Sequence, residues 1–210
     1  MKVIAANIGK PTVIQWKGKE EITGIFKYPV TKAIELGTEV VANDTVANRA
    51  VHGGEYKACY LFSADEYTYW KNLYPDLSWD WGMFGENLSV QDLDEASIRI
   101  GNVYKVGSAL VQISQPREPC YKLGVRFGSQ GIIQQFIDRG YPGTYVRILQ
   151  KGNVKAGDHL ELIEEADNPL TIQQFYQLLF SREKDKQHLK LAIENTALPE
   201  AKREKLKRWL

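Results

Sequence analysis

Residues 109–123 read ALVQISQPREPCYKL, and this stretch decides how the fold is organised. Residues 109–114 are rich in apolar and β-branched side chains, which predicts a β-strand. Pro116 and Pro119 cannot donate the hydrogen bonds of a strand ladder, so we expect the chain to leave the sheet here. Cys120 is therefore expected on a stiffened loop at a sheet edge or at the mouth of a barrel.

Two cations, Arg117 and Lys122, lie close to Cys120 in the sequence. Such neighbours are typical of reactive or metal-binding cysteines, because the thiolate is the form that attacks electrophiles and binds soft metals. The alternative is a buried, inert cysteine, which is the commoner fate of a lone intracellular cysteine. The residues around Cys120 leave both interpretations open.

The composition limits the classes of protein to consider. Lys and Arg number 27 and Asp and Glu 26, so the charge balance gives no reason to expect stable nucleic-acid binding. There is no apolar run long enough to cross a membrane and no charged-then-apolar amino terminus, so we expect neither a membrane span nor a signal peptide. Cys59 and Cys120 alone do not imply a disulfide framework. We therefore expect a cytoplasmic protein with reduced thiols.

Short strands separated by Gly, Asn and Asp turns fill the first part of the chain. They are expected at residues 2–7, 21–28, 57–62, 98–106, 109–114, 143–150 and 159–163. Strands this short and numerous favour a closed or nearly closed β-barrel, because closure removes exposed edges. A helix is expected over residues 63–73, with Ser63 as its N-cap, and an amphipathic segment near residues 132–137. The predicted fold class is mainly β, with a barrel domain over residues 1–165.

The remainder, residues 169–210, has the pattern of a small helical appendage. Thr171 and Gln174 have capping-box spacing, and apolar side chains then recur at helical period in three segments. We expect three short helices that pack on each other, on the barrel or on a partner subunit, because none is long enough to be stable alone. The last segment is basic, but glutamates interrupt its charge, so a solvated helix face is favoured over a nucleic-acid contact.

Residues 49–57, RAVHGGEYK, form a cluster suited to phosphate. Gly53 and Gly54 allow the backbone to approach a ligand and offer its N–H groups, while Arg49, His52 and Lys57 supply cations. A hairpin turn with a solvated lysine is the alternative.

Residues 83–90, MFGENLSV, describe a turn that enters a strand. Glu86 and Asn87 could hold a polar ligand there or tie the loop down. His159 and His188 are isolated, so neither predicts a zinc pair. The absence of a dinucleotide fingerprint and of a Walker sequence disfavours nucleotide-binding α/β folds.

Four motifs in order resemble the MOSC domain, named for the carboxy-terminal part of molybdenum cofactor sulfurases. They are the His-Gly-Gly cluster of residues 49–57, the FGENL of residues 84–88, the ISQPREPC of residues 113–120 and the GYPG of residues 140–143. The resemblance runs from about residue 30 to residue 165. The tail resembles that of a bacterial subfamily implicated in detoxifying N-hydroxylated purine bases.

This resemblance implies a mostly β barrel that holds a molybdopterin-type molybdenum cofactor in an open cleft. Cys120 matches the cysteine that is the protein ligand to molybdenum in related amidoxime-reducing proteins. The expected cofactor-binding residues are Arg49, His52, Gly53, Gly54, Lys57, Glu86, Asn87, Ser114, Gln115, Arg117 and Lys122. Residues 41–48, VANDTVAN, depart from the Gly-rich acidic turn of the family, and Asp44 is expected to fill the acidic position.

The implied activity is reduction of N-hydroxylated bases or related N-hydroxy compounds, with electrons from a separate reductase. Two alternatives stay open: a carrier or docking module for the cofactor, and a sulfur transferase that carries a persulfide on Cys120. The subunit assembly, including a homodimer, is also left open by the sequence.

Overall fold

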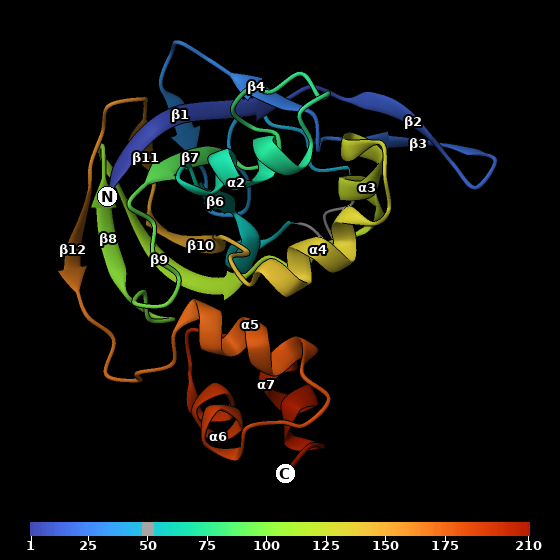
Figure 1. The fold of residues 1–210 in the computed structure, drawn as a ribbon. Coiled ribbons are helices and arrows are strands. Elements are labelled where there is room, and N and C mark those ends of the chain that lie inside the picture. The colour runs from blue at the N-terminus through green and yellow to red at the C-terminus, as the bar shows by residue number, and fades with distance from the viewer. Residues whose placement is uncertain (48–52) are drawn as a thin grey trace.

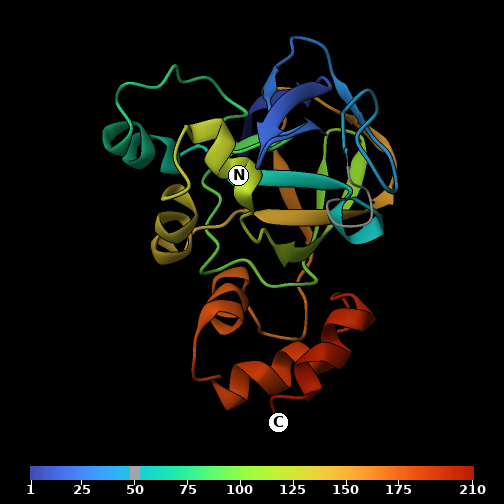
Figure 2. The same ribbon diagram turned by 90° about the vertical axis from the view of Figure 1, so that its right-hand side faces the viewer.

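The computed structural model describes residues 1–47 and 53–210. Its centre is an eight-stranded mixed sheet in the order β12-β8-β9-β10-β6-β7-β1-β4. Helices α2, α3 and α4 lie on one side of this sheet, and the helices of the tail lie together beyond one end of it (Figures 1 and 2). Two small two-stranded sheets, β2-β3 and β5-β11, complete the β-structure of these residues.

The strands are β1 (Lys2–Gly9), β2 (Thr12–Trp16), β3 (Lys19–Thr23), β4 (Lys27–Pro29), β5 (Ile34–Leu36), β6 (Cys59–Ser63), β7 (Leu88–Gln91), β8 (Val103–Val106), β9 (Ala109–Pro116), β10 (Thr144–Gln150), β11 (Gly152–Val154) and β12 (Leu160–Glu164). The helices are α2 (Glu66–Leu73), α3 (Tyr121–Phe127), α4 (Ile132–Arg139), α5 (Ile172–Phe180), α6 (Lys186–Glu194) and α7 (Glu200–Lys207), and a 3-10 turn, η1, covers Glu55–Lys57.

The sheet is mixed because α2 carries the chain between two parallel strands. β6 and β7 pair in parallel with Leu61 opposite Leu88, whereas the other pairings of the large sheet are antiparallel. A parallel pair needs a crossover connection, and the segment that contains α2 provides it. The central strands β9 and β10 place Val111, Ile113 and Val146 in the core, where each is almost fully buried.

The expected closed barrel is not confirmed. The strand order has two ends, β12 and β4, and no continuous ladder joins them among the described residues. The start of β1 nevertheless meets the turn before β12: Lys2 and His159 form a single bridge, and the Leu160 N–H donates to the Met1 carbonyl at 3.0 Å. The large sheet is therefore strongly curved but joined only locally along this seam.

Most expected strands are present with shifted ends, but two expectations are wrong. Residues 21–28 do not form one strand, because the chain breaks between β3 and β4 at residues 24–26. Gly24 lies against the backbone of Thr45, where a Cβ would come within 1.8 Å of the carbonyl oxygen. Ser63 does not cap a helix: it ends β6, and α2 begins after Asp65.

The tail contains the three expected helices, and the predicted capping box is confirmed. The Gln174 N–H donates to the Thr171 hydroxyl, and the Thr171 N–H donates to the Gln174 side chain. Apolar side chains of α5 and α6, such as Phe175 and Leu189, belong to the same core cluster as Ile113 of β9. The tail thus shares the main core of the sheet. None of the described helices is both long enough and apolar enough to cross a membrane.

Candidate functional site

A cleft of about 680 Å³, its open mouth included, lies where the ends of several sheet strands meet α3. Five expected site residues line it: Lys57, Asn87, Arg117, Cys120 and Lys122. Its wall also contains residues from the turn after the β2-β3 hairpin and from residues 44–47. The cleft therefore joins segments that are far apart in the sequence.

The thiol loop, residues 116–120, connects β9 to α3 and presents Cys120 to this cleft. The sequence placed this loop at a sheet edge or at the mouth of a barrel. β9 is an inner strand between β8 and β10, so the loop leaves the sheet at the end of an inner strand and not from an edge strand. Cys120 has an extended backbone and occupies the N-cap position of α3, a helix that was not expected. Its side chain is half-buried, in contrast to the fully buried Cys59 of β6.

Arg117 forms a buried cationic part of the wall. Its guanidinium lies over the rings of Tyr60 and Phe136, at 5.2 and 5.6 Å from their centroids. Its Nη1 atom is buried and has no hydrogen-bond partner within the described part of the chain. A buried guanidinium that keeps an unused donor is suited to an anionic ligand, because leaving such a donor unsatisfied costs free energy.

Lys57 ends the 3-10 turn η1 and lines the same cleft. Burial is the largest cause that lowers the pKa of its ammonium group, and the positive charge of Lys202 lowers it further. Negative charge at Glu118 and at Cys120 acts in the opposite direction. Lys57, Cys120 and Glu118 are thus close enough to influence one another electrostatically.

Ser114 and Gln115, which were expected to bind the cofactor, contact the turn that carries Lys57. The Ser114 hydroxyl donates to the Tyr56 carbonyl at 2.7 Å, and the Gln115 amide donates to the same carbonyl at 3.3 Å. Neither is among the residues that line the cleft. The structure therefore places them behind η1, where they fix its position.

The glycine cluster is only partly described. Gly54 precedes η1 with φ of +90°, a conformation that favours glycine, and its carbonyl accepts from the Lys57 N–H at 2.9 Å. Gly53 lies beside it. The expected cations Arg49 and His52 fall outside the described residues.

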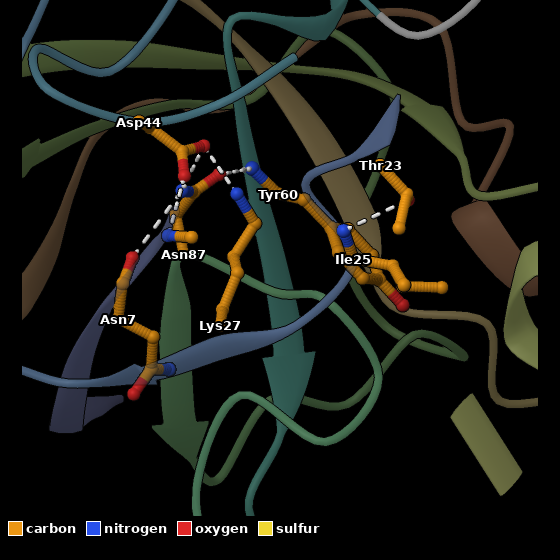
Figure 3. A network of polar contacts seen from close by, with 8 residues as sticks. Asn7, Thr23, Ile25, Lys27, Asp44, Tyr60 and Asn87 are labelled. Atoms are coloured by element: carbon orange, nitrogen blue, oxygen red, sulfur yellow. Dashed lines mark hydrogen bonds and ion pairs between the residues drawn. The ribbon is translucent and has the colours of Figure 1, made fainter. Parts of the chain in front are cut away.

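A second polar group of the cleft centres on Asp44, which the sequence placed at the acidic position (Figure 3). Its carboxylate forms an ion pair with Lys27, and the two side chains are only 2% and 7% exposed. It also accepts from the Asn87 side-chain amide at 2.9 Å and from the Gly9 N–H at 2.8 Å. Asp44 thereby ties together residues from four separate segments.

Asn87 connects this network to the sheet. Its side-chain oxygen accepts from the Tyr60 N–H at 3.2 Å, while its amide nitrogen points to Asp44 (Figure 3). The sequence analysis did not identify Lys27 as a site residue. Its partner Asp44 lies 17 residues away in the sequence, and only the fold brings the two side chains together.

Glu86 lies off the cleft. Its carboxylate accepts from the Gly82 and Phe84 N–H groups at 2.9 and 3.1 Å, from the Ser89 hydroxyl at 2.7 Å and from the Tyr67 hydroxyl. Burial raises the pKa of Glu86, although these donors oppose that effect. This geometry agrees with the alternative in which Glu86 ties its loop down. It does not place Glu86 among the residues that line the cleft.

The donor set of the described residues does not suit a metal ion held by protein ligands alone. No group of three or more His, Cys, Asp or Glu side chains converges there. The cleft instead offers one thiol together with the cations Arg117, Lys57 and Lys122. This set suits a metal that arrives with most of its own ligands on an anionic cofactor.

Comparisons with known proteins agree with this architecture. The crystal structure of YiiM from Geobacillus stearothermophilus superposes with a TM-score of 0.83 at 28% identity, covering 100% of this chain and 98% of that one. The uncharacterized protein YflK of Bacillus subtilis (strain 168) is 38% identical over 172 residues, which are 81% of this chain and 77% of YflK. A protein of Gibberella moniliformis named "Reductase" is 32% identical over 151 residues, 70% of this chain but 27% of that protein.

The family model described as "MOSC domain" matches residues 48–161. This range contains the strands β6 to β10, the thiol loop and Lys57, and it contributes about half of the residues that line the cleft. The chain belongs to the MOSC domain family.

Proposed function

We propose that the cleft binds a molybdopterin-type molybdenum cofactor and that the protein reduces N-hydroxylated bases or related N-hydroxy compounds. The observation that carries this proposal is the meeting of a half-buried thiol, Cys120, with the buried and incompletely bonded guanidinium of Arg117 in one cleft. A soft sulfur ligand and an anion-binding group are the two things that a phosphate-bearing dithiolene cofactor requires of a protein.

The residues present fit this group. Cys120 would supply the protein ligand to molybdenum, and Arg117 would meet the anionic part of the cofactor together with Lys57 and Lys122. Lys27 forms a buried ion pair with Asp44, and this pair would shape the wall of the cleft. When bound, the cofactor would supply two-electron chemistry with an acceptor for the substrate oxygen.

The chain's own residues then have limited tasks. They hold the cofactor, exclude bulk water from the buried side of the cleft and provide protons. Reduction of an N-hydroxyl compound to an amine consumes two electrons and two protons and releases water, so a proton donor near the cleft is needed. Lys57 Nζ is one such group, because it lines the cleft and carries protons, and burial lowers its pKa.

The electrons should come from a separate protein. An iron–sulfur cluster takes about four cysteine ligands, and this sequence has 2 cysteines, one of which is assigned to molybdenum. No dinucleotide fingerprint is present in the sequence. The expected electron donor is a cytoplasmic reductase that docks transiently at the cleft. We expect neither a nucleic-acid partner nor a membrane partner. The family and the relative named "Reductase" support an oxidoreductase role, although the match spans only a part of that relative.

Turnover tests this proposal. The full-length protein is purified from a molybdate-fed host that makes the cofactor, and is assayed with an N-hydroxylated purine and an artificial reductant. The wild type and Cys59→Ala should form the amine, whereas Cys120→Ala should not. NADH or NADPH should support turnover only when a flavoprotein reductase fraction is added. Absence of amine from cofactor-loaded wild type would refute the proposed activity.

A further inference from the structure

Lys202 connects the helical tail to the thiol loop. It lies near the start of α7, and its Nζ donates to the Glu118 carboxylate at 2.7 Å, across 84 residues of sequence. The Lys202 side chain is 20% exposed, and its ammonium group lies 5.6 Å from the ring centroid of Phe175 in α5. Lys202 is therefore held between the tail and the loop, and is not a freely solvated lysine.

Glu118 is a carboxylate in an unfavourable place for an anionic ligand. It stands between Arg117 and Cys120 in the thiol loop, next to the cations that line the cleft. Both Glu118 and Lys202 affect the pKa of Lys57, after burial as the main cause, and they do so in opposite directions. The fields of both members of the ion pair therefore reach the wall of the cleft, where they oppose each other.

We propose that Lys202 is a positioning residue of the cleft, which neutralises Glu118 and so preserves the positive field that an anionic, phosphate-bearing ligand meets. The three-helix tail is then a working part of the site and not only a cover for the sheet. The inference rests on the proposed use of the cleft for an anionic cofactor. Its test needs neither molybdenum nor turnover, so the two proposals can fail separately.

An ordinary surface ion pair would give a different result. Such pairs contribute about 0–1 kcal/mol to folding, so the loss of Lys202 would have little consequence beyond a small change in stability. Under the proposal, its loss leaves the charge of Glu118 uncompensated near Cys120. The quantity to measure is therefore the electrostatic field at the Cys120 thiol.

Two alkylating reagents of similar size measure this field. Iodoacetate carries a negative charge and iodoacetamide is neutral, so the ratio of their rates at Cys120 reports local charge and cancels the accessibility of the thiol. The full-length chain is prepared without cofactor, and mass spectrometry locates the label. Cys59 is fully buried and should not compete. In Lys202→Met, the iodoacetate-to-iodoacetamide ratio should fall about 2- to 5-fold at low salt, and the difference should shrink at high salt.

A second substitution separates charge neutralisation from a merely structural role. The double variant Lys202→Met/Glu118→Gln should return the ratio to the wild-type value or above it, because no carboxylate remains to be neutralised. Glu118→Gln alone should raise the ratio about 2- to 5-fold, which keeps the test decisive if Lys202→Met is poorly folded. Lys207→Met is the matched control, since Lys207 lies on the same helix and pairs with Glu204 at 2.6 Å, and its ratio should not change.

Two results would overturn the proposal. One is an unchanged ratio in folded Lys202→Met or in Glu118→Gln. The other is a double variant that stays as low as Lys202→Met alone, because Lys202 would then act through packing and not through Glu118.

Discussion

Replacing Asp44 by Asn should destabilise the protein through the loss of a single buried charge. The substitution keeps the shape of the side chain but leaves the Lys27 ammonium, 7% exposed, without its counter-ion. The new amide keeps one acceptor oxygen in place of two and carries no charge, so it cannot serve the ammonium, the Gly9 N–H and the Asn87 amide as the carboxylate does. Removing one member of a buried ion pair typically costs about 3–5 kcal/mol, and we expect a loss near 3 kcal/mol.

Urea unfolding followed by tryptophan fluorescence measures this loss, since the chain contains 5 Trp. Lys27→Met/Asp44→Asn, which removes both charges and keeps an acceptor oxygen at position 44, should recover a large part of the stability that Asp44→Asn alone loses, because no uncompensated ammonium is then buried. Glu204→Gln is the control: it breaks an ion pair whose members are about half exposed, and it should cost less than about 1 kcal/mol. A loss below about 1 kcal/mol in Asp44→Asn would refute the reasoning that this pair is a buried structural unit of the cleft.

Three further predictions concern the cleft and the core around it. Lys57→Ala should weaken retention of the cofactor by about 1.5–3 kcal/mol and make retention more salt-sensitive. Molybdenum analysis after gel filtration at a series of salt concentrations measures this. Retention equal to wild type at every salt concentration would remove Lys57 from the set of cofactor-binding residues. Burial raises the pKa of Glu95 to about 7 from 4.5, so between these pH values the folded state keeps a proton that the unfolded state has lost. The free energy of unfolding should therefore fall, by up to about 3 kcal/mol, as pH rises through this window, and the same slope in Glu95→Gln would contradict the assignment. Cys59→Ala should cost about 1–2 kcal/mol of stability without changing bound molybdenum, and a loss of metal with the fold intact would show that the wrong cysteine is assigned.

The sequence predicts those parts of the fold in which a local pattern is strong. β9 and β10 carry apolar and β-branched residues in runs long enough to identify, and Thr171 with Gln174 identifies the start of α5. β5 and β11 have three residues each, so no periodicity can appear in them. α3 spans 7 residues and contains Gly124, which fits closely against Gln130, so neither its length nor its composition indicated a helix.

The residues of the candidate site also fall into those that the sequence could predict and those that it could not. Cys120 and Arg117 stand out because their chemistry is packed into one short motif, and the fold places both in the cleft. Lys27 and Lys202 could not be found from the sequence, because each depends on a carboxylate that tertiary structure brings near from another segment. Glu86 shows the opposite case: its motif is conspicuous, yet its carboxylate already accepts from its own turn, from β7 and from α2.

The central claim is that Cys120 binds the molybdenum of a cofactor held in this cleft, and metal analysis tests it most directly. Wild type, Cys120→Ala and Cys59→Ala are purified under the same gentle conditions from a molybdate-fed, cofactor-competent host, and molybdenum per protein is determined together with the urea midpoint. We predict bound molybdenum in wild type and Cys59→Ala, its loss or strong reduction in Cys120→Ala, and nearly unchanged stability in Cys120→Ala because that thiol is half-buried at a loop. Equal molybdenum content and turnover in wild type and a folded Cys120→Ala would contradict the ligand assignment.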